Sequence, residues 1–255
     1  MENAPAMDPE LLMAASHGQH RHLTRLIARE DQVAAPSSSE RPTSVVVEID
    51  GGAVTTSSPA SIMLEGVTPD GDSALHVIAA SGDVDRYLES AKVIHGKAGH
   101  LLATRNRGGR TPLHRAARAG NVEMLSLLIH LAAGDVGDGG EGGGGETRLE
   151  TILRMTNGVG ETALHEAIRV DDTRAVGVLM SADPCLARHH LVGAASPLFL
   201  AVALCRYSLA QELYRRDNQL SYSGPAGQNA SGILASSLCF FCERARLGIA
   251  LLRAR

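Results

Sequence analysis

Aromatic residues are scarce in this 255-residue chain, at 3% of the sequence, and tryptophan is absent. A core with so few rings must be built from leucine, valine, isoleucine and alanine. Strands favour aromatic side chains, so this composition argues against a β-sandwich or barrel and favours closely packed helices. Apolar residues still reach 44%, which is ordinary for a folded protein. The length suits one or two globular cores, or one extended array of repeats.

The chain also lacks an excess of positive charge. Its 24 Lys and Arg residues are outnumbered by 28 Asp and Glu residues, which gives a net charge of −4. We therefore expect no nucleic-acid partner, because no global positive field is present to hold a phosphate backbone. One local basic cluster comprises Arg105, Arg107, Arg110, Arg115 and Arg118. It is either a solvated loop and helix start, or a site for an anionic partner such as a phosphorylated peptide or a lipid headgroup.

Long hydrophobic runs are missing as well. No stretch of about 18 uninterrupted apolar residues occurs, so we expect no membrane span. The first residues lack the basic and apolar segments of a secretory signal. The four cysteines imply no dense disulfide framework and favour a reducing compartment. We therefore expect a cytoplasmic protein.

One four-residue pattern recurs along the chain. It reads SALH from Ser73, TPLH from Thr111, TALH from Thr162 and SPLF from Ser196, at spacings of 38, 51 and 34 residues. An alanine-rich segment follows each quartet, and then an apolar helical run. The longest interval contains the glycine-rich stretch 134–146. We expect this stretch to be a flexible loop, because so many glycines cannot offset their backbone entropy by burying apolar area.

The residue types of the quartet fit the start of a helix. Thr111 is a good N-cap, and Pro112 suits the first helical position, where its missing N–H has no consequence. Gly120 suits the left-handed position after the helix. Ser73, Thr162 and Ser196 take the cap position in the other units, and Pro197 takes the position of Pro112.

The segment GRTPLHRAARAGNVEMLSLLI, residues 109–129, resembles the ankyrin repeat nearly position for position, and GETALHEAI is similar. The last spacing also lies close to the ankyrin period of about 33 residues. The N-terminal MDPELLMAASHGQHRHLTRLI resembles a divergent first repeat, with Leu12 at the histidine position. The resemblance implies an all-α ankyrin-repeat solenoid of stacked helix-turn-helix units with short β-hairpin loops. It also implies a protein-interaction module rather than an enzyme.

A narrower resemblance concerns the plant ankyrin proteins of the accelerated-cell-death type. It rests on the opening MDPELLMAASHG and on GPAGQNA at residues 224–230. In those proteins a membrane domain of several helices, the PGG domain, usually follows the repeats. The resemblance implies a role in plant signalling or defence. The alternative is the cytosolic half, or a truncated isoform, of a membrane-anchored protein, held at the cytosolic face of the plasma membrane.

His114 is either a reactive group or part of the framework. A general base needs a nucleophile and an orienting acid, and a zinc ligand needs partners at ligand spacing; the sequence shows neither. The resemblance implies that this imidazole hydrogen-bonds within and between adjacent units, as would His76 and His165. The CxxC pair Cys239 and Cys242 lacks the second pair of a zinc site. We expect no catalytic residue, no metal and no cofactor.

These observations predict four regions. Residues 1–30 form the divergent first repeat, 31–68 a flexible Ser/Pro/Thr-rich insertion, 69–223 the further ankyrin repeats, and 224–255 an incomplete repeat with a divergent tail. A small hairpin around Asp50-Gly51 is the alternative for the insertion.

Repeat position alone indicates the contact residues. Hairpin tips and first helices line the concave face of a repeat array, where variable residues select partners. We expect a monomer that binds an unidentified protein. The candidates are Asp70, Asp72, Arg107, Arg110, Arg115, Arg118, Asn157 and Glu161. Joint substitution of Arg110 and Arg115 is expected to weaken partner capture without changing the melting temperature.

Overall fold

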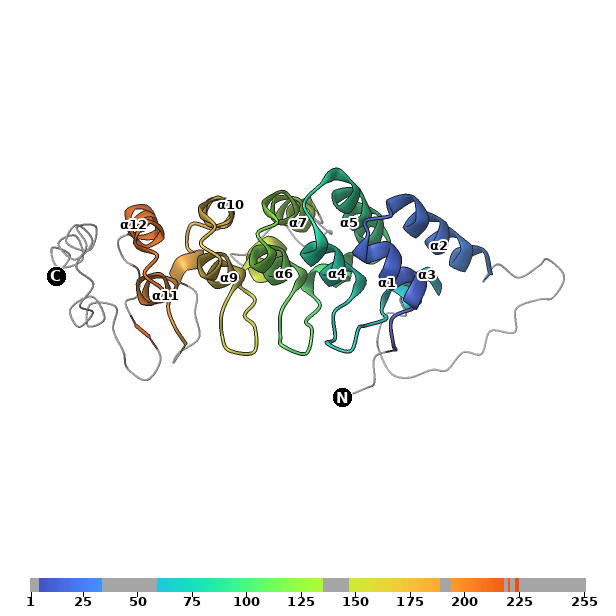
Figure 1. Cartoon of the computed structure of the whole chain (residues 1–255), viewed down its shortest axis with the longest axis horizontal. Helices are drawn as coiled ribbons and strands as arrows, with labels where there is room; N and C mark the ends of the chain where they lie inside the picture. The colour runs from blue at the N-terminus through green and yellow to red at the C-terminus, as the bar shows by residue number, and fades with distance from the viewer. Residues whose placement is uncertain are drawn as a thin grey trace.

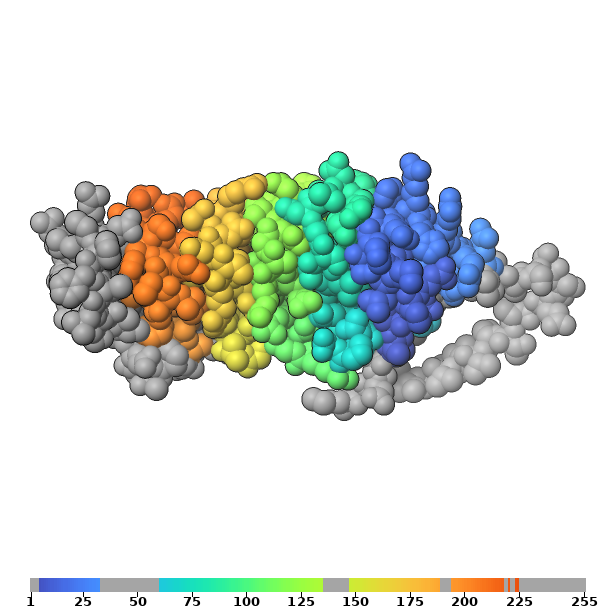
Figure 2. All heavy atoms as spheres, in the orientation of Figure 1, coloured from blue at the N-terminus to red at the C-terminus, as the bar shows by residue number. Residues whose placement is uncertain are grey.

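A computed structural model of the chain describes residues 5–33, 59–134, 147–188, 194–217, 220 and 223–224. In this part of the chain five helix pairs are stacked side by side, and Figure 2 shows them as successive bands along the long axis. The pairs are α1 (Pro9–Ser16) with α2 (His20–Val33), α4 (Ala74–Ser81) with α5 (Asp85–Lys97), α6 (Pro112–Ala119) with α7 (Val122–Gly134), α9 (Ala163–Arg169) with α10 (Thr173–Ala182), and α11 (Pro197–Ala203) with α12 (Tyr207–Arg216). The predicted all-α solenoid is confirmed.

The helices form two rows (Figure 1). The first helices make one row, in which α4 packs against α1 and α6, and α9 packs against α6 and α11. The second helices make the other row. Small side chains allow the first helices to approach closely, since Ala79, Ala116 and Ala167 are fully buried. The loops that precede the first helices project together from one edge of the stack (Figure 1).

Caps connect the units as well as ending the helices. Thr111 is the N-cap of α6, Pro112 lies in its first turn, and Gly120 is its C-cap at φ 73°. The carboxylate of Asp83 accepts the backbone N–H groups of Glu123 and Met124 at the start of α7 in the next unit. A carboxylate there satisfies otherwise unpaired donors and suits the positive end of the helix.

Helix α1 begins one residue earlier than the alignment of Gly18 with Gly120 predicts. Asp8 accepts the backbone N–H groups of Glu10 and Leu11, so α1 begins at Pro9. Leu11 is fully buried whereas Leu12 is 36% exposed. Gly18 has a positive φ of 64°, as Gly120 does at 73°, which supports their alignment. Leu12 therefore lies at the histidine position, but it is exposed and makes no buried link there.

Short helices lie between the helix pairs in the sequence, and one of them changes a predicted boundary. They are α3 (Pro59–Leu64), η1 (Gly99–Ala103), α8 (Arg148–Arg154) and η2 (Leu186–Arg188). Helix α3 lies inside the predicted insertion, yet it packs against α2 and α5 and buries Ala60 and Leu64 completely. Apolar burial therefore makes the end of this range part of the folded array. The suggested hairpin at Asp50-Gly51, the glycine-rich loop beyond Gly134 and the predicted tail beyond Gly224 lie outside the described residues.

The repeat position of Gly120, just after the first helix, carries strain in two units. This position is Gly120 in the third unit, but Asp171 in the fourth and Cys205 in the fifth, with φ values of 61° and 59°. A side chain in the left-handed region costs about 1–2 kcal/mol, which glycine avoids.

We therefore expect Cys205→Gly to raise the free energy of unfolding by about 1 kcal/mol. Urea denaturation measures the change. Cys205→Ala is the matched control, because it removes the thiol but keeps a Cβ at positive φ. Equal stabilisation by both variants would contradict the strain argument.

Candidate functional site

Three imidazoles join consecutive units. In each case Nε2 lies within hydrogen-bond distance of the carbonyl of the residue that precedes the next N-cap. The pairs are His76 with Arg110 (2.8 Å), His114 with Glu161 (3.0 Å) and His165 with Ala195 (2.9 Å). Nδ1 accepts the backbone N–H of the unit's own N-cap, at 3.3 Å from Thr111 in the case of His114. Since Nδ1 accepts, Nε2 carries the proton and donates to the carbonyl.

Burial keeps the central imidazole neutral. His114 is 1% exposed. Desolvation lowers its pKa to about 4, although the hydrogen bond to the Glu161 carbonyl acts in the opposite direction. The pKa of His76 is also lowered, chiefly by burial. With both ring nitrogens bonded to the backbone, His114 has no nitrogen available for a substrate or a metal.

The fifth unit lacks this link because Phe199 replaces the histidine. The ring is 4% exposed and lies against Gly224, where a Cβ would come within 2.3 Å of a ring carbon. The oxygen Oγ of Ser196 accepts a hydrogen bond from the backbone N–H of Phe199 at 3.1 Å, so Ser196 still caps the start of α11. The backbone N–H of Ser196 donates instead to the carbonyl of Ser223 at 3.0 Å.

The projecting loops are tight turns that touch one another. The loop at Asn106 is closed by its backbone N–H, which donates to the Arg110 carbonyl at 2.9 Å. Successive tips are joined by the backbone N–H of Gly158, which donates to the Gly108 carbonyl at 2.9 Å. Gly109 has φ 73°, and a Cβ there would lie 2.6 Å from the Gly158 nitrogen. Within the described residues the loops contain only isolated β-bridges, so they are hairpin-like turns without extended strands.

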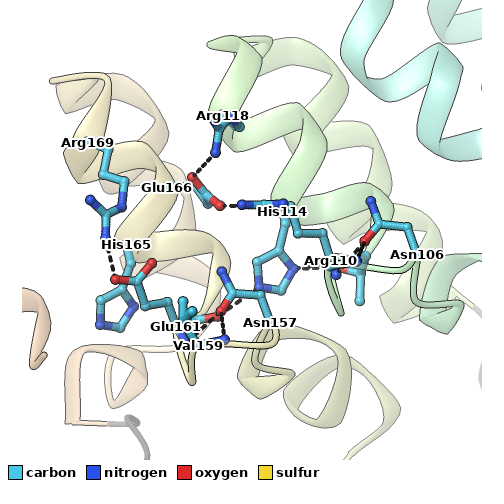
Figure 3. A network of polar contacts seen from close by, with 12 residues as sticks. Asn106, Arg110, His114, Arg118, Asn157, Val159, Glu161, His165, Glu166 and Arg169 are labelled. Atoms are coloured by element: carbon cyan, nitrogen blue, oxygen red, sulfur yellow. Dashed lines mark hydrogen bonds and ion pairs between the residues drawn. The ribbon is translucent and has the colours of Figure 1, made fainter. Parts of the chain in front are cut away.

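A layer of ion pairs lies above this framework (Figure 3). Glu166 on α9 has a side chain only 2% exposed, and its oxygens lie 3.1 Å from Nε of Arg110 and 3.5 Å from a terminal nitrogen of Arg118. These pairs cross from the third unit to the fourth. Arg169 pairs with Glu161 beside them.

A second ion pair joins the third unit to the second. Arg115 lies 3.2 Å from a carboxylate oxygen of Asp72, whose side chain is 7% exposed. The side-chain amide of Asn106 donates to the other oxygen of Asp72 at 2.7 Å. The arginines of α6 and its loop therefore hold both neighbouring units.

Three predicted contact residues are buried and belong to the framework. Asp72 and Asn157 are 5% exposed and Glu161 is 6% exposed. Asn157 uses its side-chain oxygen to accept the backbone N–H groups of Val159 and Glu161. Burial therefore removes all three from the predicted partner-binding set.

The other predicted residues reach solvent to different degrees. Asp70 and Arg107 are exposed at the loop tips, and the Arg118 side chain is 53% exposed. Arg110 and Arg115 are each 32% exposed and pair with buried carboxylates. We therefore revise the expectation for these two arginines, since their substitution leaves a buried charge without its partner.

Sequence reasoning missed Glu166 and Arg169. Aligning the quartets places Glu166 at the position of Arg115 and Arg169 at the position of Arg118. This alignment with two predicted contact residues could have identified both. In the described part of the chain, no group of three or more His, Cys, Asp or Glu side chains is arranged to hold a metal ion. No helix described there is both long and apolar enough to cross a membrane.

Comparison with known families agrees with this geometry. Residues 75–129 match the sequence model of a family described as ankyrin repeats (many copies), and the match extends from α4 into α7. A search of curated proteins found no match. The match covers part of the chain, residues 75–129, and it agrees with the all-α ankyrin-repeat fold of the described residues. Ankyrin repeats indicate a protein-interaction module. The comparisons do not support the narrower resemblance to the plant accelerated-cell-death proteins with PGG domains.

The buried imidazole predicts a specific dependence of stability on pH. The pKa of His114 is about 4 in the folded chain, below its ordinary value of 6.5. Between these values the unfolded chain binds a proton that the folded chain does not, so stability falls as the pH falls. We expect this group to cost about 3 kcal/mol of unfolding free energy between pH 7 and pH 4.

Urea denaturation of the wild type and His114→Gln across this range measures the effect. The variant is expected to be less stable at pH 7 and to approach the wild type at pH 4. His130→Gln, at an exposed position of α7, is the matched control. Parallel pH curves for the wild type and His114→Gln would refute the assignment.

The ion-pair layer gives a second expectation. Arg110→Ala is expected to lower the free energy of unfolding by about 2 kcal/mol, because buried Glu166 loses its closer partner. The control is Arg174→Ala, which removes a pair between side chains 71% and 56% exposed. Exposed pairs contribute about 0–1 kcal/mol. Equal losses for the two variants would contradict the structural role of Arg110.

Proposed function

We propose that the chain is a non-enzymatic adaptor that binds a protein partner on its first-helix face. We define this face as the loop tips at 68–72, 105–110 and 156–161 together with the exposed side chains of α4, α6 and α9. The support is a contrast between repeat positions. Ser or Thr recurs at the N-cap of α4, α6, α9 and α11, and His follows it in the first three of these helices. The position of Arg118, by contrast, is Ala80 in α4, Arg169 in α9 and Ala203 in α11.

The framework makes this face suitable for binding. Imidazole links, touching loop tips and ion pairs all fix its backbone, so little conformational entropy remains to be lost on association. The reactive-looking imidazoles beneath it are occupied by backbone groups. We further propose that the adaptor acts as a monomer in the cytoplasm.

A second proposal is a role in plant signalling or defence, or as the cytosolic part of a membrane-anchored ankyrin/PGG protein. It is supported only by the resemblance of MDPELLMAASHG and GPAGQNA to that family. Expression in leaf tissue, with defence-gene transcripts as the readout, tests it. Unchanged transcript levels would count against this role without affecting the adaptor proposal.

Site-specific photocross-linking tests the adaptor proposal. A photoreactive amino acid is placed at Ala119, exposed on α6, or at Ser181, exposed on α10 in the other row. In extracts of the source cells we expect a discrete cross-linked protein from position 119 and none from position 181. Circular dichroism confirms that both variants fold. No product from position 119, or the same products from both positions, would contradict the proposal.

A further inference from the structure

On the first-helix face, the ion-paired negatively charged side chains are buried and the positively charged ones reach solvent. Its ion-paired carboxylates are buried, with Asp72, Glu161 and Glu166 side chains 7%, 8% and 2% exposed. The guanidinium groups above them reach solvent, with Arg118 53% and Arg169 41% exposed. The face therefore presents cations, although the chain as a whole has a net charge of −4.

The ion pairs do not balance this positive charge. Glu166 offers one carboxylate to two guanidiniums, and the distance to Arg118 is the longer one at 3.5 Å. Arg105 and Arg107 are exposed at the neighbouring loop and form no ion pair within the described residues. Among the described residues of this face, Asp70 is the only exposed acid. A positive excess therefore remains available to a ligand.

The exposed cations are also held in place. Arg118 and Arg169 occupy the same repeat position on the neighbouring helices α6 and α9, so they follow one another along the stack. Packed helices lie about 8–10 Å apart, which sets the spacing of these positions. The carboxylates beneath restrict the long side chains before any ligand arrives. Preorganised guanidiniums bind carboxylates through strong, often bidentate hydrogen bonds.

We propose that the first-helix face binds an acidic peptide segment of its partner, with Arg107, Arg118 and Arg169 contacting the partner's carboxylates. The inference rests on the proposed function of the same face. A peptide suits the site better than an anionic membrane does. Polybasic membrane segments carry about 4–8 clustered Lys or Arg residues. On this face Arg110, Arg115, Arg118 and Arg169 already pair with buried carboxylates, which leaves only Arg105 and Arg107 without an ion pair among the described residues.

Fluorescence anisotropy with a labelled hexaglutamate peptide tests the inference, with hexaglutamine as the matched peptide. We expect the acidic peptide to bind at least about tenfold more tightly at low salt, and salt to weaken it. Arg118→Gln and Arg107→Gln are each expected to weaken binding by about tenfold. Arg107→Gln touches no ion pair in the described residues, so its effect is separable from stability. Arg174→Gln on α10 is the control and is expected to bind as the wild type does.

Three results would overturn the inference: equal affinity for both peptides, equal losses from Arg174→Gln and Arg107→Gln, or binding only to vesicles containing phosphatidylserine. Failure of the inference remains distinguishable from failure of the adaptor proposal. A cross-linked protein from position 119 without hexaglutamate binding removes only the acidic-segment inference. Absence of that cross-linked protein removes the adaptor proposal itself.

Discussion

The hydrogen bond from an imidazole to the carbonyl ahead of the next N-cap is the interaction on which the rest of the structure depends. His114 accepts from its own N-cap and donates to Glu161, 47 residues further along the chain. Each unit of a solenoid contacts only its neighbours, so the stack is continuous only through such contacts. The ring also pairs backbone groups that would otherwise be buried without a partner.

The loops and the charged layer follow from this constraint. Once consecutive N-caps are tied together, the loops ahead of them must run side by side, and their tips meet at Gly109 and Gly158. The arginines of the third unit then lie above carboxylates of both neighbours. The same ion pairs therefore stabilise the stack and orient the cations that face solvent.

The candidate site was only partly predictable, for a geometric reason. Repeat position placed Arg107 and Arg118 on the exposed face. It did not reveal that Asp72 and Glu161, at equivalent loop positions, turn inward to pair with arginines. From the sequence alone, an acidic residue on a short helix, such as Glu166, is also expected to be exposed. Glu166 is buried because Arg110 and Arg118 of the preceding unit cover it.

The sequence by itself determined where the repeated helices begin, which residues cap them and which histidines serve the framework. Those features depend on residues within one helical turn, so the recurring four-residue pattern is enough to predict them. Only the tertiary structure decided which charges are buried and that α3 packs into the array. These depend on contacts between distant residues, such as Arg110 and Glu166, which are 56 positions apart. No local pattern specifies such a contact, because it exists only once neighbouring units have stacked.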